Sequence, residues 1–188
     1  MDPQLWWYTA RAGGIVALAL TAGSVIWGLL LSTRVLQGRP SGAWLLDLHR
    51  FLGGAAVIFT GIHLAGLVAD TYVHFGVADL LVPFASDWKT GAVAWGIVAF
   101  YLLLAVELTS LFMNRIPRLW WKRIHLTSYV LFWAGVLHGA FAGTDAGNPV
   151  YVGTMVSLIV LVAGLTLYRV LTARKFRGVF TTPAATTF

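Results

Sequence analysis

The 188-residue sequence contains no cysteine and few charged residues. Without cysteine, the chain has no disulfide bond, no cysteine-ligated iron–sulfur cluster and no prosthetic group attached through a thioether. Charged residues make up 11% of the sequence, whereas soluble domains typically contain about 25%. The first shortage excludes a small secreted fold held by disulfides, and the second disfavours any soluble globular fold.

The sequence is correspondingly rich in hydrophobic residues. They account for 59% of the sequence, and the mean hydropathy is +0.79. Too few polar residues remain to cover the surface of a soluble protein, so composition indicates a membrane protein. The net charge is +6, but the basic residues lie in short connections and near the C-terminus, without interleaved aromatic residues. We therefore expect lipid headgroups as their partners and no binding of nucleic acid.

Five apolar stretches are long enough to cross a hydrocarbon core of about 30 Å. They cover residues 13–31, 44–68, 91–112, 124–142 and 151–171. The sequence therefore predicts an all-α, polytopic membrane bundle of about five transmembrane helices. We expect residues 1–172 to form the membrane domain and residues 173–188 to form a short basic cytoplasmic tail. No Lys/Arg-rich segment precedes the first stretch, which is therefore expected to be an uncleaved helix.

The charges in the connections predict the orientation. The second and fourth connections carry most of the acidic residues, namely Asp70, Asp79, Asp87 and Asp145. The first and third connections and the C-terminal region carry Arg34, Arg39, Arg115, Arg118, Lys122, Arg123, Arg169, Arg174, Lys175 and Arg177. By the positive-inside rule, the basic segments and the C-terminus are cytoplasmic and the N-terminus is outside. We expect an integral protein of the plasma membrane.

Four of the five histidines lie inside apolar stretches, where an ionisable residue is costly and indicates a functional site. His49 and His63 belong to the second stretch, and His125 and His138 belong to the fourth. These two helices run in the same direction across the membrane. His49 and His125 should therefore share a level near the cytoplasm, while His63 and His138 share an outer level. The fifth, His74, is expected to be a solvated loop residue.

The spacing of the histidines suits a cofactor ligated from two helices. His49 and His63 are 14 residues apart, which gives a rise of about 21 Å and nearly whole helical turns. His125 and His138 are 13 residues apart, which in an ideal helix turns them about 140° from each other. Local tightening of the helix, a tilt, or a distortion near Gly135 would have to absorb this difference. Because haem iron takes axial imidazoles from facing helices, the two pairs predict two b haems stacked between the second and fourth helices.

Several neighbours of the histidines are candidates for supporting roles. Arg50 and Arg123 are placed to pair with haem propionates, although each could instead anchor its helix at the lipid headgroups. Glu107, the only glutamate, could relay protons or tune the inner haem, or simply reach the interface. Small residues would let a flat macrocycle approach the backbone, or would let helices pack closely. They are Gly53, Gly54, Gly61, Gly135 and Gly139.

The histidine pattern resembles that of a known family. His49-x13-His63, His125-x12-His138 and the basic, Trp-containing run from Arg118 to Tyr129 resemble the ferric reductase-like transmembrane domain. That family includes ferric reductases, NADPH oxidases and the haem-binding membrane subunit of a periplasmic methionine sulfoxide reductase. The resemblance covers roughly residues 5–171. It implies an inner b haem on His49 and His125 and an outer b haem on His63 and His138.

The resemblance implies transmembrane electron transfer to an exterior acceptor, either ferric iron or a periplasmic redox partner. The sequence has no G-x-G-x-x-G fingerprint after a strand. We therefore expect an oxidoreductase component without its own FAD or NAD(P) domain, whose donor is a separate flavin reductase or membrane quinol. The alternative is a haem-b membrane anchor subunit of a larger quinone-linked oxidoreductase. A metal transporter is disfavoured, because each helix holds its two histidines about 20 Å apart.

Overall fold

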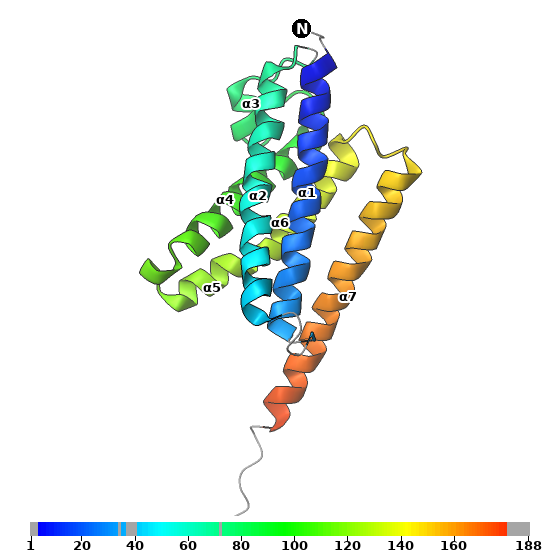
Figure 1. Ribbon diagram of the computed structural model, residues 1–188. Coiled ribbons are helices and arrows are strands. Elements are labelled where there is room, and N and C mark those ends of the chain that lie inside the picture. The colour runs from blue at the N-terminus through cyan, green and yellow to red at the C-terminus, as the bar shows by residue number, and fades with distance from the viewer. Residues whose placement is uncertain (1–3, 34, 37–40, 72, 180–188) are drawn as a thin grey trace, which may run out of the picture.

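A computed structural model describes residues 4–33, 35–36, 41–71 and 73–179 of the chain. Every regular element in these residues is a helix (Figure 1). The elements are α1 (Gln4–Thr33), α2 (Gly42–Ala69), α3 (Val77–Leu81), α4 (Thr90–Leu111), the 3-10 turn η1 (Met113–Arg115), α5 (Arg118–Leu126), α6 (Ser128–Ala142) and α7 (Pro149–Val179). Arg34, Arg39 and residues 180–188 of the predicted tail lie outside the described residues.

Five segments of these helices are long and apolar enough to cross a membrane. They are α1, α2, α4, the combined segment Arg118–Ala142, and Pro149–Thr172 of α7. The predicted all-helical membrane architecture is thereby confirmed. Large apolar side chains also point away from the protein interior, among them Phe51 at 68% exposure and Val160 at 64%. Such surfaces match a lipid environment and would be a liability in water.

The bundle consists of two antiparallel helix pairs with α7 beside them. α1 packs along α2, and α4 packs along α6, while the backbones of α2 and α6 make at most marginal contact. The α1–α2 approach depends on small residues: a Cβ on Gly66 would lie 2.7 Å from the backbone nitrogen of Ala10. Lipid is as apolar as the helices, so association inside a membrane relies on this kind of close packing.

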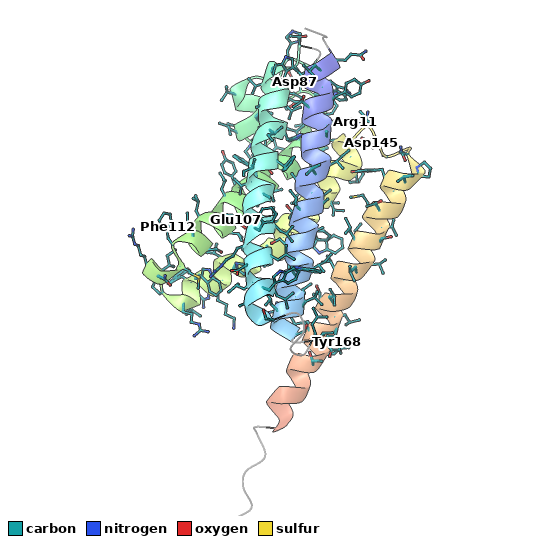
Figure 2. The ribbon with its side chains drawn as sticks, viewed as in Figure 1. Arg11, Asp87, Glu107, Phe112, Asp145 and Tyr168 are labelled. Atoms are coloured by element: carbon teal, nitrogen blue, oxygen red, sulfur yellow. The ribbon has the colours of Figure 1, made fainter. Side chains whose placement is uncertain are left out.

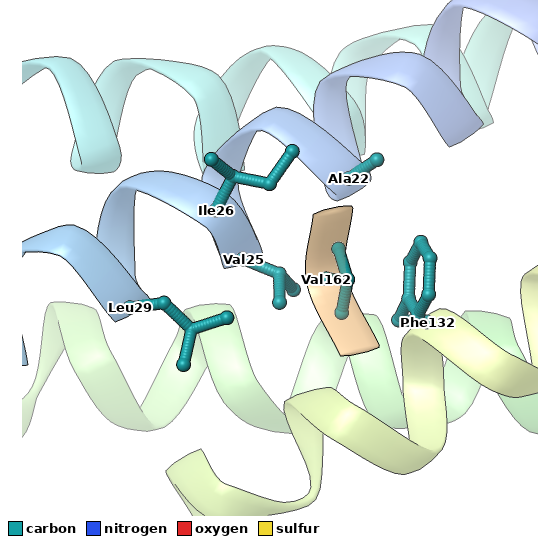
Figure 3. Packing of buried hydrophobic residues seen from close by; sticks show 6 residues of the cluster. All are labelled: Ala22, Val25, Ile26, Leu29, Phe132 and Val162. Atoms are coloured by element: carbon teal, nitrogen blue, oxygen red, sulfur yellow. The ribbon is translucent and has the colours of Figure 1, made fainter. Parts of the chain in front are cut away.

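Buried apolar clusters join the two pairs. The first cluster connects α1, α6 and α7 (Figure 3); it contains Ala22, Val25, Ile26, Leu29, Phe132 and Val162. The second connects α2, α4 and α6; it contains Ala56, Ala99, Leu103, Leu131 and Ala134. Ala56 lies midway along α2 between His49 and His63. The second cluster therefore fills the bundle between the two histidine levels.

The long connection between α2 and α4 folds onto one end of the bundle. Phe75 and Leu80 pack with Val93 of α4 in a third buried cluster, and the rings of Phe75 and Trp88 meet edge to face at 5.8 Å. Lys89 then donates from Nζ to the carbonyl oxygen of Phe141, at 3.0 Å. A lysine suits this position because the C-terminal carbonyls of a helix are unpaired and carry partial negative charge.

An ion pair closes the same end of the bundle. The Arg11 guanidinium of α1 donates two hydrogen bonds to the Asp145 carboxylate, which lies between α6 and α7 (Figure 2). The Nε–Oδ2 distance is 2.6 Å. Asp145 is only 8% exposed, whereas the Arg11 side chain is 37% exposed, so this two-pronged contact is partly shielded from solvent. It fixes the α6–α7 connection against α1.

Replacing Asp145 should therefore destabilise the bundle. We expect Asp145→Ala to lower the free energy of unfolding by about 1–3 kcal/mol, the usual range for hydrogen bonds to charged groups. The measurement is thermal unfolding in detergent. Asp87→Ala is the matched control, because Asp87 lies exposed at the same end and should tolerate the change. Equal midpoints for the two variants would show that the ion pair does not stabilise the fold.

Candidate functional site: two histidine pairs across the bundle

The four membrane histidines face each other as two pairs across the space between the helix pairs. His49 of α2 faces His125 of α5, with ring centres 5.9 Å apart and ring planes at 73°. His63 of α2 faces His138 of α6, with ring centres 6.1 Å apart and planes at 77°. The structure thus brings together the same residues that the sequence analysis placed at common levels.

These separations leave room for one metal atom between the rings. Imidazole nitrogen binds a metal at about 2 Å, so two nitrogens on opposite sides of a metal lie about 4 Å apart and the ring centres lie further out. No group of three or more His, Asp or Glu side chains in the described part of the chain could hold a metal ion. Each pair therefore suits a metal whose remaining ligands belong to a prosthetic group.

Backbone carbonyls orient three of the four imidazoles. The Nδ1–oxygen distances are 2.9 Å from His49 to Ser24, 2.6 Å from His63 to Ala10, and 2.9 Å from His138 to Ala92. A carbonyl oxygen can only accept, so Nδ1 carries the hydrogen in each of these rings. The lone pair of Nε2 then remains free for a metal, the arrangement that orients ligating histidines generally.

A glycine stands four residues after each of these carbonyls, and we call this combination a glycine seat. The glycines are Gly14 after Ala10, Gly28 after Ser24, and Gly96 after Ala92. A Cβ on Gly96 would lie 2.6 Å from Nδ1 of His138, and one on Gly14 would lie 2.9 Å from Nδ1 of His63. A helical side chain covers the turn that precedes it. Only glycine therefore leaves the carbonyl open to the imidazole.

The fourth histidine has a different partner. Nδ1 of His125 lies 3.3 Å from the Oγ atom of Ser110 in α4. Ser110 follows Gly96 by 14 residues, the same interval that separates Gly14 from Gly28 on α1. Ser110 therefore occupies the position where the other three histidines have a glycine, and its hydroxyl takes the place of the carbonyl.

A break in the helix explains how His125 and His138 face the same partner helix. α5 ends at Leu126 and α6 begins at Ser128. Between them, the backbone N–H of Thr127 bonds to the carbonyl of Ile124 at 2.9 Å, and the Thr127 hydroxyl bonds to the same oxygen at 2.7 Å. This tighter turn changes the angle between the two histidines. Of the three possibilities that the spacing left open, the structure shows local tightening, and it lies at Thr127 and not near Gly135, which is inside the regular helix α6.

Two indole groups, one on α1 and one on α5, have a buried Nε1 atom, and the second of them stacks on His125. The Trp121 ring stacks on His125, with centres 5.1 Å apart, and Trp27 directly precedes Gly28. Both Nε1 atoms are buried and have no hydrogen-bond partner within the described part of the chain. Buried donors normally find an acceptor, so these two N–H groups are available to an additional polar group.

The arginines near this pair differ from those that the sequence singled out. Arg50 is exposed and lies 4.0 Å from Asp47, and the Arg123 guanidinium lies over the Trp120 ring at 5.5 Å. Arg169 of α7 is half-buried, donates to the Tyr129 hydroxyl at 2.8 Å, and lies within electrostatic range of His125. Sequence reasoning treated Arg169 only as part of a basic tail, because nothing in one sequence shows that α7 approaches the start of α6.

The glycines that the sequence analysis placed beside the histidines differ in what surrounds them. Gly135 and Gly139 line an apolar cavity of about 200 Å³ that also contains the rings of His63 and His138. Gly14, Ala17, Gly96 and Ala99 are among the other small residues of its wall. Gly54 and Gly61 have no neighbour within 4 Å of an added Cβ. Residues of α1, α2, α4 and α6 form most of the cavity wall, together with Tyr151 of α7.

Glu107, the only glutamate of the chain, packs against Gly53. A Cβ on Gly53 would lie 2.9 Å from the carboxyl carbon of Glu107, which reaches it from α4 (Figure 2). Within the described part of the chain, no hydrogen bond or ion pair engages the Glu107 carboxyl. Gly53 follows His49 by four residues, so the carboxyl lies near the His49–His125 level. His74, by contrast, is exposed in the connection after α2, which confirms it as a loop residue.

Comparison with known families agrees with this constellation. The family model described as "Ferric reductase like transmembrane component" matches residues 13–136, which include His49, His63 and His125. The match covers more than half of the chain, so the protein belongs to the ferric reductase-like transmembrane family, as the sequence analysis inferred. Neither the comparison with curated proteins nor that with solved structures gave a match.

A side chain at a glycine seat should displace the histidine. We expect Gly96→Ala to lower the free energy of unfolding by about 1–3 kcal/mol, because the new methyl group overlaps the His138 ring. Gly91→Ala in the same helix is the control: its Cβ would have no neighbour within 4 Å, and it should be neutral or slightly stabilising. Unfolding in detergent measures both, and a neutral Gly96→Ala variant would contradict the packing described here.

Proposed function

We propose that this protein conducts electrons across the plasma membrane through two b-type haems. His49 and His125 would hold the inner haem, and His63 and His138 the outer one. The observation that carries the proposal is the pair of facing imidazoles at each level, 5.9 and 6.1 Å apart between ring centres. Membership of the ferric reductase-like family supports transmembrane electron transfer independently.

Features around both pairs support this proposal. The two imidazoles at each level would hold a haem, and small residues from four helices line the cavity beside His63 and His138. The unpartnered Nε1 atoms of Trp27 and Trp121 could bind the propionates of the inner haem. Arg169 is the best-placed cation for the same role, beside Arg50 and Arg123, which the sequence suggested.

The protein's own groups would set how this cofactor behaves. When bound, haem supplies reversible one-electron chemistry, which the chain tunes but does not perform. Two imidazoles per haem leave no open position on the iron, so direct oxygen binding is disfavoured. The apolar cluster around Ala56 and Leu131 separates the two levels and excludes water between them. The hydrogen bonds on Nδ1 keep the ligands in the correct tautomer.

The distribution of basic residues over the two ends of the bundle predicts which side of the membrane the electron donor and acceptor occupy. α5, with Arg118, Lys122 and Arg123, lies at the same end as the start of α2 and the end of α7 (Figure 1). By the positive-inside rule this end is cytoplasmic and the N-terminus is outside. Electrons would enter here from a separate flavin reductase or from quinol, and leave outside to ferric iron or a periplasmic redox partner. In the alternative role, a haem-b anchor of a larger quinone-linked enzyme, the chain would depend on a stable partner.

Haem content tests the ligand assignment. We expect two low-spin b haems per chain in a reduced-minus-oxidised spectrum, and about half of that haem after His63→Ala or His138→Ala, because each pair binds one haem. His74→Ala is the matched control, since His74 is exposed and away from both pairs. A wild-type protein without haem, after expression with sufficient haem, would refute the proposal.

Electron transfer across a sealed membrane tests the function itself. In vesicles that contain a ferric chelate, external reductant on the α5 side should reduce the enclosed iron when the wild-type chain is present. His63→Ala should slow this reduction strongly, because the route is interrupted at the outer level, whereas His74→Ala should not. Equal rates for wild type and His63→Ala would exclude conduction through the histidine pairs. Reduction that required a co-purified partner would favour the anchor role.

A further inference from the structure

The four histidines do not share the same hydrogen-bond acceptor, and the exception is on the cytoplasmic level. His49, His63 and His138 each have a backbone carbonyl 2.6–2.9 Å from Nδ1. His49 additionally has the Ser24 hydroxyl 3.1 Å from Nδ1, whereas the partner of His125 in the described part of the chain is the Ser110 hydroxyl alone, at 3.3 Å. The 14-residue interval from Gly96 to Ser110 repeats that from Gly14 to Gly28. The position beside His125 therefore differs from the three glycine seats in having a serine, Ser110, in place of glycine.

The acceptor on Nδ1 determines how strongly an imidazole donates to a metal. A hydrogen-bond acceptor on the Nδ1–H group raises the basicity of Nε2, the nitrogen that binds the metal. A longer and weaker hydrogen bond raises this basicity less. A more basic axial ligand stabilises ferric iron over ferrous iron and lowers the reduction potential. The partner of His125 is the weakest of the four by distance, so this ligand should be the least basic.

Building on the function proposed above, we infer that Ser110 is a positioning residue that keeps the reduction potential of the inner haem higher than a fourth glycine seat would. Ser110 acts through His125 and not on the iron itself. The chain thereby makes the haem nearest the cytoplasmic donor easier to reduce. A hydroxyl can accept as well as donate, so it can take the hydrogen bond from Nδ1 when Nε2 of His125 binds the iron.

Substitutions of Ser110 should shift this potential in opposite directions. Ser110→Gly would uncover the carbonyl of Val106, four residues earlier, and give His125 the stronger acceptor that the other histidines have. The potential of the inner haem should then fall. Ser110→Ala removes the hydroxyl and keeps the carbonyl covered, so the potential should rise. Each change should alter the one-electron equilibrium about three- to tenfold, up to about 59 mV.

The experiment is a potentiometric titration of the purified, haem-loaded protein, with EPR spectra of the ferric haems as a second readout. Repeating the titrations in a His63→Ala background assigns the shifted potential to the haem on His49 and His125. Ser110→Thr keeps the hydroxyl and should restore the wild-type potential. Ser157→Ala is the control for a serine hydroxyl in a helix, because Ser157 lies exposed on α7 and bonds to its own helix.

The outcomes separate this inference from the proposed function. Opposite shifts of one potential, with the other unchanged, would support the role of Ser110. Unchanged potentials, or shifts in the same direction for Gly and Ala, would overturn it while leaving two-haem conduction intact. Loss of the inner haem in both variants but not in Ser110→Thr would also overturn it, since the hydroxyl would then serve binding and not tuning. A wild-type chain without haem would instead refute the proposed function.

Discussion

The hydrogen bond from a histidine Nδ1 to a helix carbonyl is the interaction on which the rest of this bundle depends. It requires two helix backbones to lie close enough for an imidazole to fit between them, and so it requires glycine at the point of contact. On α1, Ala10 and Ser24 are 14 residues apart, as are His63 and His49 on α2. Two antiparallel helices with equal intervals satisfy both contacts in one register. The register is therefore fixed at two levels at once.

The second helix pair, α4 with the α5–α6 segment, also makes two histidine contacts, but the residue intervals on its two sides are unequal. Gly96 and Ser110 on α4 are 14 residues apart, whereas His138 and His125 are 13 apart. The turn at Thr127 makes up the difference, since it divides the segment into α5 and α6. The same turn directs α5 with its basic residues along the end of the bundle. An irregularity in the backbone thus sets both the placement of His125 and His138 and the direction of the charged segment.

Contacts at the opposite end hold the connections in place. Arg11 binds Asp145, and Lys89 caps the end of α6. Between the ends, small and aliphatic side chains fill the space around Ala56 and Phe132. In a membrane these contacts gain little from the hydrophobic effect, so their stability depends on shape and on satisfied polar groups. The two histidine levels therefore lie between packed clusters and are bounded at one end by these polar contacts.

Much of this organisation was predictable from the sequence, because a lipid environment restricts the options. Apolar length and loop charge predict spanning helices and their direction, and histidines at membrane depth indicate a site. Periodicity along one helix, however, says nothing about which residue of another helix it meets. The glycine seats, the Ser110 exception, the position of Arg169 and the turn at Thr127 all depend on contacts between helices. Only the tertiary structure decides these, since close approach of two backbones is a property of the pair and not of either segment.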